Sequence, residues 1–150
     1  MSQELGIASA EMDSVVLHVE DNDTDAYLLR LALQDAGIPA VVYRVSDGEQ
    51  ALMLLQKRNS FARAPTPDLV FLDINMPKID GWEVLNTMQA SDALRSIPVV
   101  ILTTSRLAQD RIRSYDLGAN AYIRKPSGFA PLAETLRIIY QFWTLAEPPE

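Results

Sequence analysis

Four short runs of mainly apolar residues in this chain end in polar or charged residues, and this repeated pattern restricts the folds that the chain can adopt. The runs begin at Val15, Leu69, Val99 and Ala121. Near-continuous apolar runs, in contrast to alternating ones, are typical of strands buried on both faces of a parallel sheet. Segments with apolar residues at helical spacing separate the runs. Strands that alternate with helices in this way predict an α/β fold with helices on both faces of the sheet.

The complete pattern consists of five strands and five helices. A fifth strand is expected at 41–45, and helices are expected at about 24–37, 47–58, 81–90, 107–117 and 131–145. An Asp or Thr within 22–25 can cap the first helix, Gly37 and Gly118 are typical helix stops, and Pro131 suits a first helical turn. A chain of 150 residues suits one domain. We expect that domain at 14–145, with loose tails at 1–13 and 146–150.

The polar residues that follow the strands predict a phosphoryl-transfer site. If the strands are parallel, their carboxyl ends meet at one edge of the sheet, where open α/β folds bind ligands. Glu20, Asp21, Asp73, Thr103 and Lys125 would then face a common pocket. Three neighbouring carboxylates repel one another, and Mg²⁺ would relieve that repulsion because it prefers carboxylates and phosphate oxygens. An Asp can act as a nucleophile toward phosphorus, with a hydroxyl and an ammonium to hold the phosphoryl oxygens.

The motifs around these residues resemble a response-regulator receiver domain of two-component signalling, over roughly Ser14 to Leu145. The matching marks are the Glu20-Asp21 pair, Asp73 with Asn75-Met76-Pro77 and Asp80-Gly81, Thr103, and Tyr122 three residues before Lys125-Pro126. Glu20 is a small departure, because Asp is common at that position. The resemblance implies a doubly wound, flavodoxin-like receiver fold with strand order 2-1-3-4-5.

The resemblance also implies a role for each site residue. It selects Thr103, in preference to Thr104 or Ser105, as the hydroxyl that contacts the phosphoryl group. It assigns the backbone carbonyl of Asn75 to the metal, and the side chains of Asn75 and Ser105 to the path of the hydrolytic water. Tyr122 would swing inward as Thr103 moves. The Lys125-Pro126 bond would be cis and would turn the ammonium over the pocket.

The function implied by the resemblance is a phosphorylation switch. A histidine kinase would present a phosphohistidine, and Asp73 would take its phosphoryl group with Mg²⁺, Lys125 and Thr103 stabilising the charge. Such a protein catalyses its own phosphorylation and dephosphorylation, but it is a signalling protein and not an enzyme in the usual sense. No output domain follows in this sequence, which indicates a single-domain regulator.

Three alternatives compete with this interpretation. An Asp-dependent phosphatase would need an acid two positions after the nucleophile, where this chain has Asn75. A phosphorylation-independent interaction module of receiver shape would tend to lose the acidic pair or the lysine, and this chain keeps both. Dinucleotide binding is disfavoured because no glycine-rich turn follows the first strand.

His18, the only histidine, lies within an apolar strand and is expected to be a packed, hydrogen-bonded residue and not a phosphodonor.

Composition excludes several other classes of protein. The net charge of −7 disfavours a nucleic-acid partner. The chain has no cysteine and therefore no disulfide or thiol chemistry. Its first residues do not form a signal peptide, and no run approaches the length needed to span a bilayer. We therefore expect a soluble, cytoplasmic protein without membrane association.

The last helix carries more apolar residues than a core contact requires. Helical spacing places Leu132, Leu136, Ile139 and Phe142 on one face, which is expected to meet the core. The remaining apolar residues predict a homodimer through this helix; they are Ile138, Tyr140, Trp143 and Leu145. The Phe142-Trp143 ending followed by prolines resembles the small receivers paired with phytochrome-type photoreceptor kinases, which would make such a kinase the partner.

Overall fold

The computed structural model of the chain describes residues 13–76 and 81–145, except for the side chains of residues 144 and 145. The predicted tails, apart from Asp13, lie outside these residues. The same holds for Pro77 and Asp80 of the motif after Asp73 and for the side chain of Leu145, which was assigned to the dimer contact.

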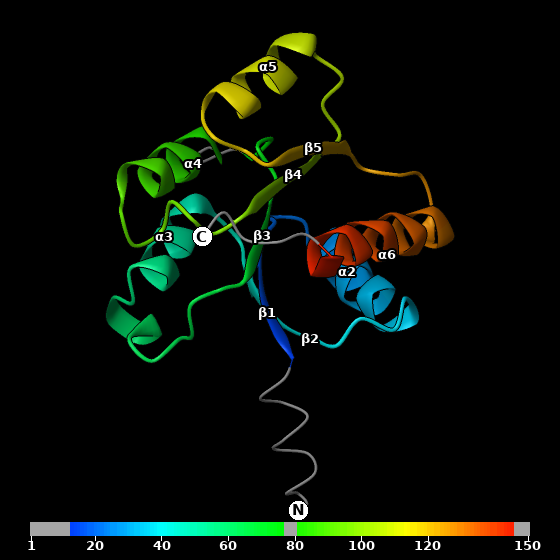
Figure 1. Cartoon of the computed structure of the whole chain (residues 1–150), viewed down its shortest axis with the longest axis horizontal. Coiled ribbons are helices and arrows are strands. Elements are labelled where there is room, and N and C mark those ends of the chain that lie inside the picture. The colour runs from blue at the N-terminus through cyan, green and yellow to red at the C-terminus, as the bar shows by residue number, and fades with distance from the viewer. Residues whose placement is uncertain (1–12, 77–80, 146–150) are drawn as a thin grey trace, which may run out of the picture.

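Five parallel strands form one sheet in the order β2-β1-β3-β4-β5, as predicted (Figure 1). The strands are β1 Ser14–Val19, β2 Ala40–Val45, β3 Leu69–Leu72, β4 Val99–Thr103 and β5 Ala121–Arg124. Every residue of the central strands β3 and β4 is buried, because helices cover both faces of the sheet. The near-continuous apolar runs in the sequence reflect this two-sided burial.

The helices alternate with the strands, and side-chain caps mark the starts of α2 and α3. They are α2 Asp23–Asp35, α3 Gly48–Leu55, α4 Gly81–Ala90, α5 Ala108–Asp116 and α6 Phe129–Leu145, with a short 3₁₀ turn, η1, at Asn59–Phe61. The cap of α2 is Asn22 and not an Asp or Thr, since its side chain accepts a hydrogen bond from the Asp25 N–H at 2.9 Å. Asp47 caps α3 in the same way. No helix among the described residues is long and apolar enough to cross a membrane.

Two apolar cores lie on opposite faces of the sheet. Helices α2 and α6 pack together on one face, and α3 and α4 lie on the other, with α5 beside β5 (Figure 1). Alternation along β1 divides its side chains between the two cores, so that Val16 faces α2 and α6, whereas Leu17 and Val19 face α3 and α4. This arrangement leaves the carboxyl edge of the sheet free for polar groups.

The face of α6 that meets the rest of the domain differs from the prediction in the last turns of the helix. Leu136 is buried, and Leu132 and Ile139 pack against the core, as expected. The assignment of Phe142 to this face was wrong, because its side chain is 66% exposed. Tyr140 and Trp143 are instead partly buried and line a small apolar cavity of about 50 Å³ at the amino-terminal end of the sheet.

His18 lies in strand β1 and is almost completely buried. It packs edge-on against Phe71, with ring centroids 6.4 Å apart. The packing confirms one part of the prediction, but the expected hydrogen bonding is incomplete because Nδ1 has no partner. Burial lowers the pKa of His18 to about 3, and the positive charges of Lys125 and Arg44 add to this effect. The imidazole is therefore neutral in the folded protein at physiological pH.

The low pKa of His18 predicts a specific loss of stability in acid. The unfolded chain binds a proton at His18 below pH 6.5, whereas the folded protein does not until about pH 3. The free energy of unfolding should therefore fall by as much as about 1.4 kcal/mol per pH unit as the pH drops from 6.5 toward 3. Chemical denaturation of wild type and His18→Val across this range measures the difference. Since the chain has no other histidine, equal pH dependence in the two proteins would contradict the prediction.

Candidate functional site

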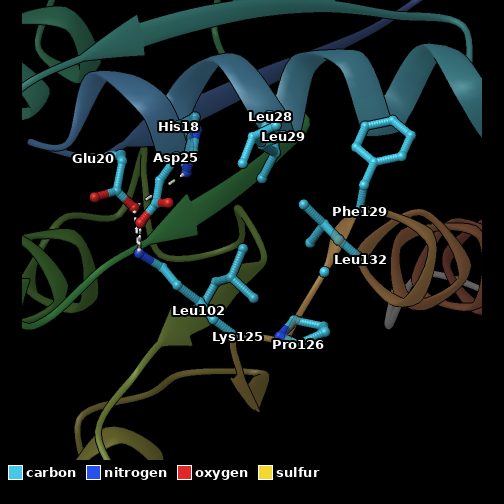
Figure 2. A pocket seen from close by; sticks show the side chains of 11 residues that line it. His18, Glu20, Asp25, Leu28, Leu29, Leu102, Lys125, Pro126, Phe129 and Leu132 are labelled. Atoms are coloured by element: carbon cyan, nitrogen blue, oxygen red, sulfur yellow. Dashed lines mark hydrogen bonds and ion pairs between the residues drawn. The ribbon is translucent and has the colours of Figure 1, made fainter.

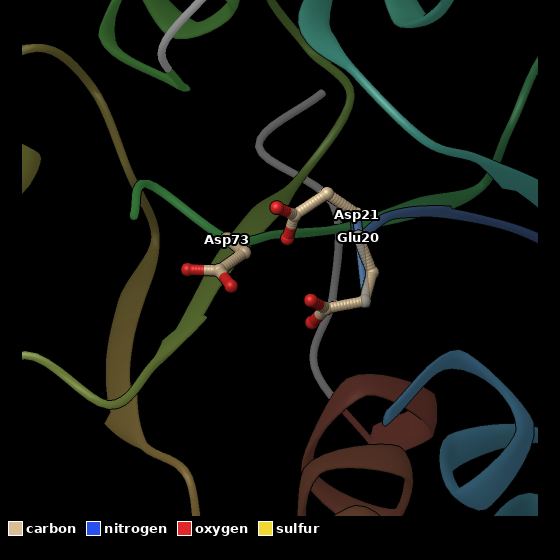
Figure 3. Close-up of side chains that lie close together, drawn as sticks. All are labelled: Glu20, Asp21 and Asp73. Carbon is tan, nitrogen blue, oxygen red and sulfur yellow. The ribbon is translucent and has the colours of Figure 1, made fainter. Parts of the chain in front are cut away.

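The register of the sheet brings three carboxylates together at its carboxyl edge. Val19 of β1 lies opposite Leu72 of β3, so Glu20 and Asp73 leave adjacent strands at the same level. The Asp73 N–H donates to the Val19 carbonyl at 3.1 Å and extends the pairing by one residue. Carboxylate oxygens of Glu20, Asp21 and Asp73 lie within 4.8 Å of one another (Figure 3). The structure therefore brings together the acidic residues that the sequence predicted.

The burial of these carboxylates makes their mutual repulsion costly. Glu20 is 1% exposed and Asp73 is 5% exposed, whereas Asp21 is open to solvent. Burial raises the pKa of Glu20, and the Asp73 carboxylate raises it further, although the hydrogen bond and charge of Lys125 oppose both effects. Hard divalent cations prefer oxygen ligands of this kind and would neutralise the excess charge. The three residues therefore fit a divalent metal site.

Lys125 reaches this edge from the end of β5. Its backbone N–H donates to the Thr103 carbonyl at 2.7 Å, which fixes the start of the side chain beside β4. The expected cis bond to Pro126 is not found, since the described residues contain no cis peptide. The ammonium nevertheless reaches the pocket, because the lysine side chain is long enough to reach it from the strand end.

The Lys125 ammonium contacts three carboxylates, and Figure 2 shows two of them, Glu20 and Asp25. Its Nζ lies 2.8 Å from Glu20 Oε1, 2.9 Å from Asp25 Oδ2 and 3.3 Å from Asp73 Oδ2. Burial by itself would lower the pKa of Lys125, but the hydrogen bonds to Glu20 and Asp25 and the charge of Asp73 hold this pKa above its usual value. Lys125 is thus a fixed positive charge beside Asp73.

Backbone contacts orient the Asp73 carboxylate. Its Oδ1 accepts the N–H of Asn75 at 2.9 Å, and Oδ2 is the oxygen that faces Lys125. Gly81 packs closely against the same turn, because a Cβ added there would lie 3.0 Å from the Asp73 carbonyl oxygen and from the Ile74 Cα. The glycine at this motif position thus permits α4 to begin directly against the strand end.

Thr103, Ser105 and Tyr122 form a chain of hydrogen bonds at the ends of β4 and β5. Thr103 is completely buried, and its Oγ1 accepts the N–H of Ser105 at 3.2 Å. The Tyr122 hydroxyl donates to the Ser105 carbonyl oxygen at 3.2 Å, while the Ser105 hydroxyl donates to Asp110 Oδ2 at 2.6 Å. These hydrogen bonds connect Thr103 through Ser105 to Tyr122 and to Asp110 in the first turn of α5.

Asp25 is the site residue that the sequence interpretation missed. It lies in the first turn of α2, four residues after Asp21, and was considered only as a helix cap. The available signal was an additional acid one helical turn beyond the acidic pair, on a helix that starts at the carboxyl edge of the sheet. Its contact with Lys125 depends on how α2 packs, which spacing alone does not show.

Comparison with known proteins supports a specific family. The family model described as "Response regulator receiver domain" matches residues 16–137. The response regulator Rcp1 of Synechocystis sp. is 37% identical over 129 residues, which cover 86% of this chain and 88% of that protein. The structure of Rcp1 in its Mn²⁺-bound form has a TM-score of 0.81 at 36% identity, covering 91% of this chain and 99% of that one.

Two other solved structures have slightly higher TM-scores than the Rcp1 structure. The phosphorylated cyanobacterial phytochrome response regulator RcpA has a TM-score of 0.84 at 38% identity and covers 92% of this chain and 99% of its own. The response regulator RPA3017 in red light signaling of R. palustris has a TM-score of 0.86 at 38% identity, with 91% and 99% covered. With the sheet order, the acidic triad and the lysine in place, this chain belongs to the response regulator receiver domain family of two-component signalling.

Proposed function

We propose that this protein is a cytoplasmic response regulator that accepts a phosphoryl group on Asp73 from the phosphohistidine of a histidine kinase. The observation that carries the proposal is the position of the Asp73 carboxylate, which lies in an acidic triad with Oδ2 3.3 Å from the Lys125 ammonium. Membership of the receiver family supplies the reaction class. The similar proteins described as phytochrome response regulators favour a phytochrome-type photoreceptor kinase as the partner.

The residues of the site divide the work of phosphoryl transfer among them. The bond formed joins a carboxylate oxygen of Asp73 to phosphorus, and the bond broken joins phosphorus to the imidazole nitrogen of the kinase. Lys125, and the hydroxyl of Thr103 once it turns toward the site, stabilise the negative charge on the transferring oxygens. Mg²⁺ bound by Glu20, Asp21, Asp73 and the carbonyl of Asn75 would supply further charge neutralisation.

Phosphorylation would act on the rest of the molecule through the hydrogen-bonded chain at the ends of β4 and β5. The acyl phosphate draws Thr103 toward it, and Tyr122 follows because both residues contact Ser105. The surface made by α5, β5 and α6 then shifts its population between two arrangements. The side chains of Asn75 and Ser105 would affect the lifetime of the acyl phosphate through access of the hydrolytic water.

The central test is Mg²⁺-dependent phosphorylation of Asp73. We expect wild type incubated with acetyl phosphate or phosphoramidate and Mg²⁺ to gain one phosphoryl group, measured by intact mass. The gain should be absent in Asp73→Asn and in wild type with excess chelator, because the nucleophile or the charge neutralisation is missing.

Asp116→Asn is the matched control for this test, since it makes the same substitution at an exposed position on α5. The control should be phosphorylated like wild type. Phosphorylation of Asp73→Asn equal to that of wild type would contradict the assignment of the acceptor. A wild type that takes up no phosphoryl group would favour the phosphorylation-independent interaction module.

We also propose a homodimer built on α6. Ile138 and Phe142 lie one helical turn apart and are 56% and 66% exposed, whereas Tyr140 and Trp143 are partly buried against the rest of the domain. The dimer contact is therefore centred on Ile138 and Phe142, with Tyr140 and Trp143 at its border. Burying one large apolar side chain contributes about 1.5–3 kcal/mol, so several per subunit can offset the entropy lost on association.

Charged substitutions on α6 test the dimer. We expect wild type to sediment as a dimer and the variants Ile138→Glu and Phe142→Glu to sediment as monomers in sedimentation velocity, because each substitution places a charge in an apolar contact. Ile112→Glu is the matched control, because Ile112 on α5 is 57% exposed and receives the same change. Wild type that is monomeric both with and without a phosphodonor would refute the dimer, and dissociation by Ile112→Glu alone would place the contact on α5.

A further inference from the structure

Lys125 has three carboxylate partners, and one of them does not belong to the acidic triad. Glu20 and Asp73 are members of the triad, whereas Asp25 contributes a third contact from another element. The Asp25 contact of 2.9 Å is shorter than the 3.3 Å contact with Asp73. Figure 2 shows the Asp25 and Glu20 carboxylates converging on the Lys125 ammonium. The lysine is thus bound at least as closely to Asp25 as to the proposed phosphoacceptor.

The first turn of α2 holds Asp25 in place. Its backbone N–H donates to the capping side chain of Asn22 at 2.9 Å, and the buried residues Ala26 and Leu29 anchor the same turn on the sheet. The Asp25 side chain is 39% exposed, compared with 1% for Glu20 and 6% for Asp73. Asp25 therefore approaches the ammonium from the solvent side, whereas the other two carboxylates approach it from within.

A cation bound by the triad would weaken the contacts of Lys125 with Glu20 and Asp73. It would attract the oxygens of these two carboxylates, and it would repel the ammonium because the cation and the ammonium both carry positive charge. Asp25 would keep its full negative charge for Lys125, since it is not one of the three grouped carboxylates. A lysine stem is flexible and gains rotamer freedom when released. Without Asp25, a bound cation would repel the ammonium, and only the weakened contacts with Glu20 and Asp73 would hold it in the site.

We propose that Asp25 is a positioning residue for phosphoryl transfer, which holds the Lys125 ammonium beside Asp73 from the solvent side. The inference rests on the proposed phosphorylation of Asp73 and adds a residue to it. Asp25 does not contact the reacting atoms and acts through Lys125. Its contact supports the lysine at the stage when metal binding weakens the other two.

The first experiment observes the lysine directly and needs no phosphodonor. The chain has three lysines, Lys57, Lys78 and Lys125, so a ¹H–¹⁵N spectrum of the side-chain ammonium groups can be assigned by substitution. We expect a slowly exchanging Lys125 signal in wild type that persists when Mg²⁺ is added. Asp25→Asn should lose this signal in Mg²⁺, because the ammonium is no longer held against solvent.

Asp23→Asn is the matched control for this experiment. Asp23 lies in the same first turn of α2 but pairs with Arg44 at 2.9 Å. Both substitutions remove one negative charge from the same helix terminus and change the helix-dipole interaction equally. The Lys125 signal should survive in Asp23→Asn. Survival of the signal in Asp25→Asn, or its loss in both variants, would overturn the proposal.

The second experiment measures the effect on phosphorylation. Asp25→Asn should slow Mg²⁺-dependent phosphorylation by acetyl phosphate about 3- to 10-fold. This is the effect expected from the loss of a charge-assisted contact that partial exposure to solvent weakens. Asp23→Asn should react like wild type. In the Lys125→Ala background the same Asp25→Asn change should have no further effect, because the two residues act as a unit.

The outcomes separate this inference from the proposed function. If wild type takes up no phosphoryl group, the proposed function fails, while the Lys125 signal still decides whether Asp25 holds the lysine. If wild type is phosphorylated and Asp25→Asn reacts at the same rate, the positioning role is wrong although the function stands. A slowing by Asp25→Asn that is equally large in Lys125→Ala would also overturn it, because the effect would not pass through the lysine.

Discussion

A single ammonium at the carboxyl edge of the sheet joins the ends of three strands and the first turn of α2. Lys125 follows β5, Glu20 follows β1, Asp73 follows β3, and Asp25 belongs to α2. Without the ammonium, the buried carboxylates Glu20 and Asp73 would face each other uncompensated, which is costly in a low-dielectric interior. The lysine offsets only part of the repulsion between the carboxylates at this edge. The remaining negative charge suits the site to a divalent cation.

The remainder of the site depends on the same edge. Because β4 and β5 are paired up to Thr103 and Arg124, the residues after them start from a fixed backbone. The backbone of Ser105 contacts both the buried Thr103 hydroxyl and the hydroxyl of the half-buried Tyr122, so hydrogen bonds connect the ends of these two strands. Below the edge, the neutral imidazole of His18 adds no charge to the site, because burial keeps it unprotonated.

Several features could not be predicted from the sequence, for identifiable physical reasons. The contact between Asp25 and Lys125 depends on where the first turn of α2 packs, which is a tertiary property. Asn22 could not be distinguished as the cap of α2 because all of its neighbours within 22–25 can also cap helices. Helical spacing predicted that Phe142 would lie on the core face, but its side chain is 66% exposed, and Trp143 is instead partly buried, where it lines the apolar cavity with Val16 and Leu69. Which apolar residues in the last turns of α6 pack on the domain thus depends on the strand residues that lie opposite them, and helical spacing does not specify these.

The sequence by itself determined the fold class, the strand positions and the five residues expected at the sheet edge. It could do so because strands buried on both faces must be apolar along their length, and the first polar residue then marks where each strand leaves the sheet. The tertiary structure alone decided which charges are in contact, since the distances from Lys125 to Glu20, Asp25 and Asp73 depend on register, helix packing and side-chain reach together. The tertiary structure also decided which apolar residues of α6 stay exposed, because exposure depends on what other elements cover and not on the residue type.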